Sequence, residues 1–478
     1  MDNIRVRFAP SPTGYIHVGS LRSALYNFLF AKKNGGKLIL RVEDTDQSRF
    51  VEGAVENLIS SMEWAGIEFD ESPQKGGDFG PYVQSERTDI YRSYCKELED
   101  KGFAYKCFCS SEDLEKMREE QQKQKVPQPQ YDRRCRKLSP EEIEERINNG
   151  EKYVVRFKVP LTKDKVEVDD MVYGNIQVES DTIADQVLLK SDGFPTYHLA
   201  NIVDDHLMKI SHVIRGEEWI PSTPLHVALY KAFGWESPTF VHLPLLVNSE
   251  RKKLSKRHGD VSVESFKEKG ILKEALVNYV ALLGWHPSGD RELFTMDELI
   301  EEFSASRINK SAAVFDYVKL DWINSQYLRD YDTNLLFDML KPEFDKAGID
   351  TEEKEKVLKV IEALKTRVNK AKEIVDQSLI FFKDQVEIEG DNLNMIREES
   401  SQILFSKIVE GLESIDFSGD SCKKMINSIG KENKIKGKML WMPVRVGLTG
   451  EQHGPDLDLI LDIFGKDEIK KRLSKQIF

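Results

Sequence analysis

The stretch "IRVRFAPSPTGYIHVGSLRSALYNFLFAKKNGGKLILRVE", residues 4–43, decides the fold of the first half of the chain. It begins with a short apolar strand, which a loop containing two prolines and Gly14 follows. From Leu21, apolar residues recur at helical spacing along one face, and Gly35–Gly36 ends the helix. A second buried strand follows. Strand, loop, helix and strand predict a βαβ unit with a parallel sheet, whose ligands bind beyond the carboxyl ends of its strands.

The bulk composition predicts a multidomain cytoplasmic protein. With 478 residues and 40% apolar content, the chain can form two or three domains. No apolar run of about 18 residues and no secretory signal are present, so we expect neither a membrane span nor export. The net charge of −13 weighs mildly against a nucleic-acid partner, although residues 251–258 and 431–438 are locally basic. The five cysteines, odd in number and sparse, argue against a disulfide framework.

The rest of the chain divides into an α/β part and a helical part. Residues 110–150 are charged and poor in large apolar residues, which predicts an insertion of two polar helices joined by a loop. Strand-like patterns return in "YVVRFKVP" and in "DQVLLKSDGFPTYHLANIVDDH". From about Asp330 onward the pattern is helical. An α/β half followed by an all-helical half indicates separate domains.

The loop before the first helix has the features of an anion site. Neither a P-loop nor a dinucleotide fingerprint is present. Gly19 would let the backbone approach a ligand, the helix would offer unpaired N–H groups, and His17 would donate a hydrogen bond. The alternative is an ordinary strand-to-helix turn capped by Ser20.

A second candidate lies in "RKKLSKRHG", residues 251–259, where Lys253 and Lys256 flank Ser255. A lysine-rich loop can close over a phosphate and neutralise its charge. The alternative is a solvated basic loop.

Taken together, "HVGS" and "KLSKR" resemble the HIGH and KMSKS signatures of class I aminoacyl-tRNA synthetases. The chain resembles the bacterial glutamyl-tRNA synthetases in particular, through stretches that run to about residue 450: "FAPSPTGYIHVG", "RVEDTD", "PYVQSER", "DGFPTYHLANIVDDH", "IRGEEWIPSTP" and "GKMLWMPVRVGLTG". Ser20 and Arg257 depart from the generic signatures, but the glutamyl family is similar at both places.

The resemblance implies a Rossmann-type α/β catalytic domain with an inserted acceptor-binding subdomain, followed by an all-α anticodon-binding half. The expected domains are residues 1–109 and 191–250 for the two catalytic halves, 110–190 for the insertion with a possible zinc site, 251–329 for the KMSKS loop with a stem-contact helical domain, and 330–478 for the anticodon-binding domain.

The implied activity is that of a glutamate–tRNA ligase, which activates L-glutamate with ATP and Mg²⁺ and transfers it to tRNA-Glu. By resemblance, the ATP-binding residues are His17, Gly19, Ser20, Lys253, Ser255 and Lys256, of which His17, Gly19, Lys253 and Lys256 are the catalytic candidates. Glutamate would be bound by Arg7, Ala9, Ser11, Glu43, Tyr197, Arg215 and Trp219. A carboxylate suits the substrate ammonium, and guanidinium groups suit its two carboxylates. Asp204-Asp205-His206 resembles a metal triad, but we expect a structural role because no fourth ligand is evident.

Three cysteines predict a zinc site. Cys107, Cys109 and Cys135 supply three thiols, although a Cys-x-Cys spacing is tighter than usual for zinc. Some glutamyl-tRNA synthetases and their shorter tRNA-modifying relatives bind zinc with a similar pattern, which implies Tyr131 as fourth ligand, since Lys137 stands where others have histidine. The alternative is three reduced thiols without metal.

The family also implies that the helical half reads the anticodon. Arg367 matches the position where an arginine favours tRNA-Glu over tRNA-Gln, although it also fits an exposed arginine on a charged helix. Four alternatives stay open: a non-discriminating enzyme that also charges tRNA-Gln, the shorter tRNA-modifying relative, glutaminyl-tRNA synthetase, and a non-catalytic tRNA-binding descendant. The helical half argues against the second and third, and the retained His17, Lys253 and Lys256 argue against the fourth. We expect a monomer.

Overall fold

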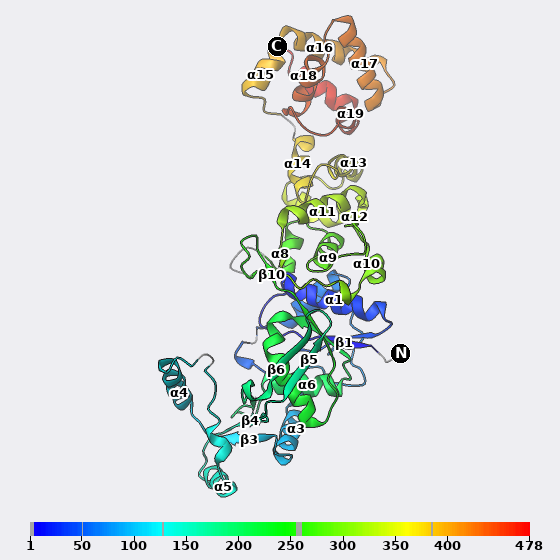
Figure 1. Ribbon diagram of the computed structural model, residues 1–478. Coiled ribbons are helices and arrows are strands. Elements are labelled where there is room, and N and C mark those ends of the chain that lie inside the picture. The colour runs from blue at the N-terminus through cyan, green and yellow to red at the C-terminus, as the bar shows by residue number, and fades with distance from the viewer. Residues whose placement is uncertain (1–3, 50, 127–128, 255–260, 384–385) are drawn as a thin grey trace. The chain divides into compact units, whose positions relative to one another are not determined.

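The computed structural model describes residues 4–49, 51–126, 129–254, 261–383 and 386–478. The chain forms two compact units. The first contains the chain up to Ser265 together with Val277–Asp316, and the second contains Phe266–Leu276 together with Tyr317–Phe478. Figure 1 shows the mixed α/β content of the first unit and the helices of the second. The domain boundaries expected from the sequence stay predictions.

The first unit opens with the βαβ unit that the sequence predicted. Strand β1 (Arg5–Phe8), helix α1 (Val18–Lys33) and strand β2 (Lys37–Leu40) follow one another, and the two strands pair in parallel. Gly35 has a φ of +63°, a conformation that glycine adopts without steric cost, and it follows the end of α1. Helix α1 is buried over most of its circumference, including Arg22 and Asn27, rather than along one face.

A four-stranded sheet continues the first unit in the order β6–β5–β9–β8. Its strands are β5 (Lys165–Asp170), β6 (Gly174–Glu179), β8 (His212–Gly216) and β9 (Thr239–Leu243). Strands β5, β9 and β8 are parallel neighbours, whereas β5 and β6 form an antiparallel pair. The amide of Ser211 donates to the carbonyl of Arg5 at 2.9 Å, so β1 begins beside β8. The carboxyl ends of β1, β2 and β8 therefore gather at one edge.

The predicted insertion contains the two polar helices, α4 (Ser111–Lys123) and α5 (Pro140–Asn148). Each begins with a serine whose hydroxyl accepts a backbone N–H three residues later while a carboxylate bonds back, a capping box. Beside them, β3 (Ala104–Cys107), β4 (Val154–Phe157) and β7 (Val187–Leu189) form an antiparallel sheet.

The strand-like interpretation of "DQVLLKSDGFPTYHLANIVDDH" is correct only for β7. Its second part forms helix α6 (Tyr197–Leu207), which is buried on polar as well as apolar positions. The polar positions include Asn201, Asp204 and Asp205, and the partners of the two aspartates come from distant segments of the chain. The local sequence pattern therefore did not indicate a buried helix, because the partners of its polar residues lie far away in the sequence.

From Tyr317 onward, every described element of the second unit is a helix, which confirms the predicted all-helical half. They are α11 (Tyr317–Asp330), α12 (Thr333–Lys346), α13 (Lys354–Leu364), α14 (Glu373–Phe382), α15 (Gly390–Arg397), α16 (Glu399–Gly411), α17 (Gly419–Glu432), α18 (Lys438–Thr449) and α19 (Leu457–Ser474). Apart from short 3₁₀ helices, the described elements not yet named are α2 (Ala54–Trp64), α3 (Thr88–Asp100), α7 (Thr223–Phe233), β10 (Leu246–Val247), α8 (Val263–Glu268), α9 (Lys273–Ala281), α10 (Met296–Glu302) and β11 (Ala313–Val314).

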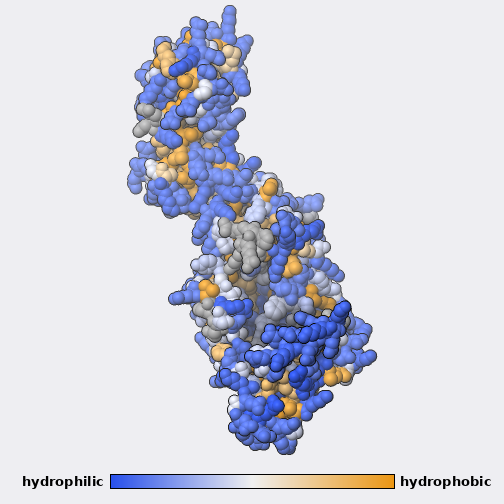
Figure 2. Space-filling view, turned by 90° about the vertical axis from the view of Figure 1, so that its left-hand side faces the viewer, coloured by the Kyte–Doolittle hydropathy of each residue, from blue (hydrophilic) through white to orange (hydrophobic). Residues whose placement is uncertain are grey.

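Hydrophilic residues cover most of the face that Figure 2 shows, and hydrophobic residues are scattered among them. This agrees with a chain in which 32% of the residues are charged. Among the described helices, none is long and apolar enough to cross a membrane.

Candidate active site

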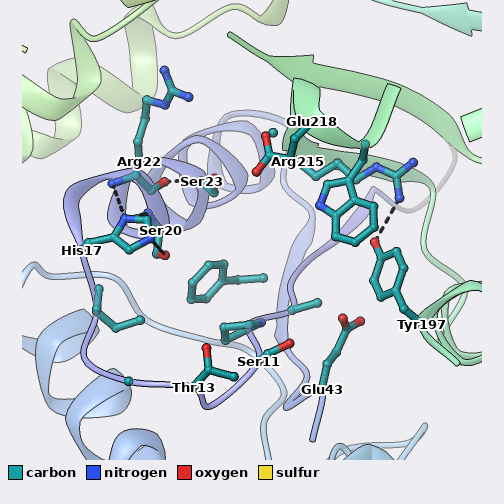
Figure 3. A pocket seen from close by; sticks show the side chains of 18 of the residues that line it. Ser11, Thr13, His17, Ser20, Arg22, Ser23, Glu43, Tyr197, Arg215 and Glu218 are labelled. Carbon is teal, nitrogen blue, oxygen red and sulfur yellow. Dashed lines mark hydrogen bonds between the residues drawn. The ribbon is translucent and has the colours of Figure 1, made fainter. Parts of the chain in front are cut away.

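A pocket of about 1020 Å³ opens at the edge where the carboxyl ends of β1, β2 and β8 gather. Its walls come from β1 and the following loop, the start of α1, and the segments after β2, β8 and β10 (Figure 3). It brings together every described residue that the sequence predicted to bind ATP or glutamate: Arg7, Ala9, Ser11, His17, Gly19, Ser20, Glu43, Tyr197, Arg215, Trp219 and Lys253. Ser255 and Lys256 lie outside the described residues.

Arg7 lines this pocket and is 3% exposed. Its Nε donates to Asp205 Oδ1 at 3.1 Å, and Arg41 Nη1 donates to the same oxygen at 2.7 Å. Neither terminal nitrogen of Arg7 has a hydrogen-bond partner among the residues that the structure describes. Asp205 thus fixes the guanidinium from one side and leaves its terminal N–H groups available for an anion.

Glu43 is a buried carboxylate beside this arginine pair. Its Oε1 accepts from Arg41 Nη2 at 2.9 Å and from Nε at 3.3 Å. Burial raises the pKa of Glu43, and the charges of Arg41 and Arg7 act in the opposite direction. A ligand cation at this carboxylate would lower its pKa, so the site is suited to an ammonium group.

Arg215 is a second buried guanidinium, and all its described hydrogen-bond partners are uncharged groups. Nη1 donates to the hydroxyl of Tyr197 at 3.1 Å, and Nη2 donates to Thr223 Oγ1 at 3.0 Å. Nε donates to His242 Nε2 at 3.2 Å, and Nη2 lies 3.2 Å from His226 Nδ1. Burial lowers the pKa of both histidines, which keeps them neutral near pH 7. Within the described chain, Arg215 has no ion pair, so its charge is available to a bound anion.

An aromatic pair closes the same side of the pocket. The ring of Trp219 stacks on that of Tyr197, with centroids 4.1 Å apart. Figure 3 shows Tyr197, Arg215 and Glu43 on one side of the pocket, with His17 and Ser20 on the other. The pocket therefore has two ends of different chemistry.

His17 is the N-cap of α1, where the sequence suggested Ser20. Its Nδ1 accepts from the backbone N–H groups of Gly19 at 3.1 Å and Ser20 at 3.3 Å. The expectation that the start of the helix offers unpaired N–H groups is therefore wrong for Gly19 and Ser20, because the imidazole itself accepts from both. A Cβ on Gly19 would lie 3.0 Å from two ring atoms of His17, so this glycine makes room for the imidazole.

Several residues line the pocket that sequence reasoning did not single out. Glu218 and Lys190 are charged examples, and Lys190 Nζ donates to the carbonyl of Thr45 at 3.3 Å. Arg22 also lines it and is held by the carbonyls of Leu283 and Pro244. Glu218 lies in the stretch "IRGEEWIPSTP", so the family resemblance could have identified it. No motif or residue spacing singled out Lys190 or Arg22 as binding residues.

The aspartate pair of α6 has the structural role expected for it. Asp204 accepts from Arg87 Nε at 2.7 Å and from the Tyr91 hydroxyl at 2.8 Å, and Asp205 holds Arg7 and Arg41. His206 instead stacks on the ring of Trp235. The three neighbouring residues therefore do not share one site.

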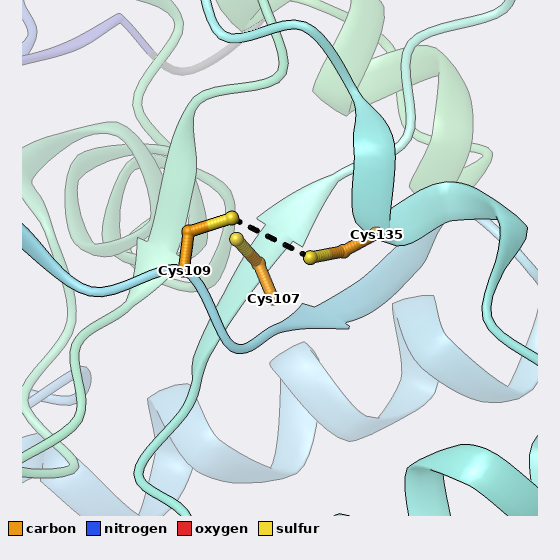
Figure 4. Close-up of side chains that lie close together, drawn as sticks. All are labelled: Cys107, Cys109 and Cys135. Carbon is orange, nitrogen blue, oxygen red and sulfur yellow. Dashed lines mark hydrogen bonds between the residues drawn. The ribbon is translucent and has the colours of Figure 1, made fainter. Parts of the chain in front are cut away.

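The predicted zinc ligands come together in the first unit. The sulfur atoms of Cys107, Cys109 and Cys135 all lie within 4.8 Å of one another (Figure 4). The hydroxyl of Tyr131 lies 3.3 Å from Cys107 Sγ and 3.7 Å from Cys109 Sγ. Hydrogen bonds from the Cys135 and Tyr131 side chains lower the pKa of Cys107 to about 4, against the effect of burial. The group has the donors of a tetrahedral site, and a thiolate is the form that binds metal.

Arg367 lies in the second unit, in the turn after α13, rather than on a helix. It is exposed, and it is close enough to Arg445 to help burial lower the pKa of that guanidinium. Arg367 and the half-buried Arg445 therefore place two positive charges near each other, and Asp456 also lies close to Arg445.

Comparisons with known proteins agree with this geometry. The model of the class I tRNA synthetase (E and Q) catalytic domain matches residues 3–322, and an anticodon binding domain matches residues 335–477. The chain is 49% identical to the glutamate–tRNA ligases of Alkaliphilus metalliredigens and Clostridioides difficile, over 99% of its length and 98% of theirs. It superposes with a TM-score of 0.93 on the crystal structure of a glutamate tRNA ligase from Elizabethkingia meningosepticum in complex with its amino acid, at 38% identity over 100% of this chain and 99% of that one. The chain therefore belongs to the glutamate–tRNA ligase family of class I tRNA synthetases.

Proposed function

We propose that the chain activates L-glutamate with ATP and transfers it to the 3′ end of tRNA-Glu. The observation that carries this proposal is the charge pattern of the pocket, which Arg7, Arg215 and Glu43 all line. Glutamate has two carboxylates and one ammonium, which these three groups complement. Glutamine would leave a buried guanidinium without an anion, and a site built for a charged partner rejects such an analogue strongly.

In the first step, a carboxylate oxygen of glutamate attacks the α-phosphorus of ATP, and the bond to the β-phosphate breaks to release pyrophosphate. We assign His17, Gly19, Ser20 and Lys253 to the triphosphate end of the pocket, with Ser255 and Lys256 assigned from the sequence alone. Charge moves onto phosphate oxygens in this step, so positioned donors and cations supply most of the stabilisation. Mg²⁺ bound with ATP would neutralise part of that charge.

In the second step, a hydroxyl of the terminal adenosine of tRNA attacks the carbonyl carbon of glutamyl-adenylate, and AMP leaves. We assign Ala9, Ser11 and Trp219 to the walls that hold the glutamyl group, beside Tyr197 and Arg215. The chain contributes orientation rather than covalent chemistry in this step.

Gly19→Ala tests the assignment of His17. The added methyl group would displace the imidazole from its position over the start of α1. We expect kcat for glutamate-dependent ATP–pyrophosphate exchange, measured with tRNA present, to fall about 10- to 100-fold, because small displacements of a positioning group are costly. Gly289→Ala is the matched control, since a Cβ there meets no atom within 4 Å. An unchanged kcat in Gly19→Ala would remove His17 from the mechanism.

We also propose a structural zinc ion held by Cys107, Cys109, Cys135 and Tyr131. The three converging thiols and the adjacent hydroxyl support this proposal. Burial raises the pKa of Cys109, so zinc must displace its proton, and zinc affinity should rise with pH.

Metal analysis tests the zinc proposal directly. We expect about one zinc per chain in the wild type, and loss of that zinc in Cys109→Ser, because a tetrahedral site loses one of its four ligands. Cys422→Ala is the control, since this buried cysteine lies in α17, outside the cluster. Tyr131→Phe should retain zinc less tightly in a competition with a chelator. Zinc-free wild-type protein would favour three reduced thiols.

For tRNA selection, we propose that Arg367 helps to favour tRNA-Glu over tRNA-Gln and that the chain acts as a monomer. The exposure of Arg367 beside Arg445 supports a contact with RNA, and the match of the anticodon binding domain includes this residue.

The function is tested by ATP-dependent attachment of radiolabelled glutamate to separate tRNA-Glu and tRNA-Gln transcripts at one stated salt concentration. We expect tRNA-Glu to be charged and tRNA-Gln to be charged far more slowly, with the difference reduced in Arg367→Ala but not in the exposed control Lys346→Ala. Equal charging of both tRNAs would establish a non-discriminating enzyme and remove the argument for Arg367. No charging of either tRNA would favour the non-catalytic descendant.

A further inference from the structure

Behind Arg215, three parallel strands place three side chains in a row. Arg215 on β8 is paired in register with His242 on β9, and Asp170 ends β5 on the other side of β9. Asp170 Oδ2 lies 2.6 Å from His242 Nδ1, and His242 Nε2 accepts from Arg215 Nε at 3.2 Å. The Asp170 and His242 side chains are fully buried, and neither of these residues lines the pocket.

Asp170 is itself held firmly. Its Oδ1 accepts from the backbone N–H groups of Val172 at 2.9 Å and Tyr173 at 2.8 Å, and its Oδ2 also accepts from the backbone N–H of His242 at 3.1 Å. These donors keep the carboxylate ionised and fix its orientation. The carboxylate therefore accepts a hydrogen bond from the protonated Nδ1 of His242. Nε2 of His242 then carries a lone pair, which faces the arginine.

This arrangement has a consequence for the charge of Arg215. A carboxylate in direct contact with the Arg215 Nε–H would neutralise part of the positive charge that attracts a substrate carboxylate. Here a neutral imidazole takes that place, and the negative charge lies one residue further from the pocket. His226, Thr223 and Tyr197 complete a ring of uncharged partners, which orients the guanidinium without pairing its charge.

We propose that Asp170 and His242 are positioning residues that fix Arg215 and keep its charge available for a carboxylate of the amino-acid substrate. The proposal rests on the proposed function, in which Arg215 binds that carboxylate. The role of Asp170 is to select the tautomer of His242, and the role of His242 is to accept a hydrogen bond from the Arg215 Nε–H.

Asp170→Asn tests the tautomer. The amide oxygen would remain with the N–H groups of Val172 and Tyr173, so its NH₂ group would face His242. The imidazole would then carry its proton on Nε2, opposite the Nε–H of Arg215, as happens when an amide replaces a carboxylate beside a catalytic histidine. We expect KM for glutamate to rise about 10- to 100-fold, because two buried donors, the Nε2–H of His242 and the Nε–H of Arg215, would face each other. KM for ATP should stay near the wild-type value.

Two variants of His242 separate positioning from a merely structural role. His242→Gln retains an acceptor near the Nε2 position and loses the contact with Asp170. His242→Asn retains a donor near the Nδ1 position for Asp170 and loses the acceptor for Arg215. We expect a larger rise in the glutamate KM for His242→Asn than for His242→Gln, whereas a need only to satisfy buried Asp170 predicts the opposite order.

The measurement is glutamate-dependent ATP–pyrophosphate exchange by the full chain, with tRNA-Glu present and with thermal melting to compare folded variants. If the wild type catalyses exchange and the glutamate KM is unchanged in Asp170→Asn and His242→Asn, the roles of Asp170 and His242 are wrong and the proposed function still stands. Equal losses in the glutamate and ATP parameters of all three variants would also overturn the inference, because the role would then be structural. A wild type without exchange would instead overturn the proposed function.

Discussion

Replacing Arg7 with glutamine is expected to lower kcat/KM for glutamate by about 10²- to 10⁴-fold, because a buried charge-assisted contact to a substrate carboxylate is lost. Arg7 is 3% exposed, and Asp205 holds only its Nε, so the terminal N–H groups are the part that a ligand would use. The fold should tolerate the change, since Asp205 keeps Arg41 as a partner at 2.7 Å. The loss should therefore appear in glutamate binding rather than in protein stability.

Steady-state exchange kinetics with glutamate as the varied substrate measure this effect. Arg7→Lys keeps the charge but not the planar fork, so its kcat/KM should fall between those of the wild type and Arg7→Gln. Arg92→Gln is the matched control, because Arg92 is an exposed residue of α3 whose partners, within the described part of the chain, are Asp89 and the carbonyl of Gly193. A kcat/KM for Arg7→Gln within about threefold of the wild type would exclude Arg7 from glutamate binding.

The sequence allowed prediction of the elements whose causes are local. The βαβ unit was predicted from helical and strand periodicity. The structure forms β1, α1 and β2 in that order, and β1 and β2 pair in parallel. The polar helices α4 and α5 likewise follow from their serine caps and charged faces. Resemblance to the family's motifs added the pocket-lining residues, which neither periodicity nor spacing indicated.

What the sequence did not predict depends on contacts between distant segments. Asp205 is 198 residues from Arg7, and its role in orienting that arginine follows only from the packing of α6. The interpretation of the α6 segment as strand-like was wrong for the same reason, since its buried aspartates look like surface residues until their arginines are placed. His242 carries no motif, and its function is visible only where β8, β9 and β5 lie side by side.

The capping role of His17 shows a subtler difference. The sequence correctly placed a histidine at the start of α1, but the periodicity did not show that its Nδ1 would bind the first N–H groups of the helix. That contact uses Nδ1 for the fold, and the other ring nitrogen, Nε2, lies 3.4 Å from the hydroxyl oxygen of Ser20. An anion at this end of the pocket would therefore be met by side chains rather than by the N–H groups of Gly19 and Ser20.

The second large effect is expected at Lys256, which lies outside the described residues and is assigned from the "KLSKR" stretch alone. Lys256→Ala should lower kcat for glutamate activation by about 10²- to 10³-fold, a loss comparable to that caused by removing one donor to a developing oxyanion in other enzymes. KM for glutamate should change by less than about threefold, because we assign glutamate binding to Arg7 and Arg215 rather than to Lys256.

Lys252→Ala in the same segment separates a specific role from loss of local positive charge. Lys252 is exposed, pairs with Glu250 at 2.8 Å and does not line the pocket, whereas Lys253 does. We expect single-turnover adenylate formation at the wild-type rate in Lys252→Ala and at a much lower rate in Lys256→Ala. Equal rates in the two variants would mean that the basic segment acts only through its overall charge. Raising the ionic strength would then slow the wild type by a similar factor, because salt screens a diffuse charge but scarcely affects a direct contact with phosphate.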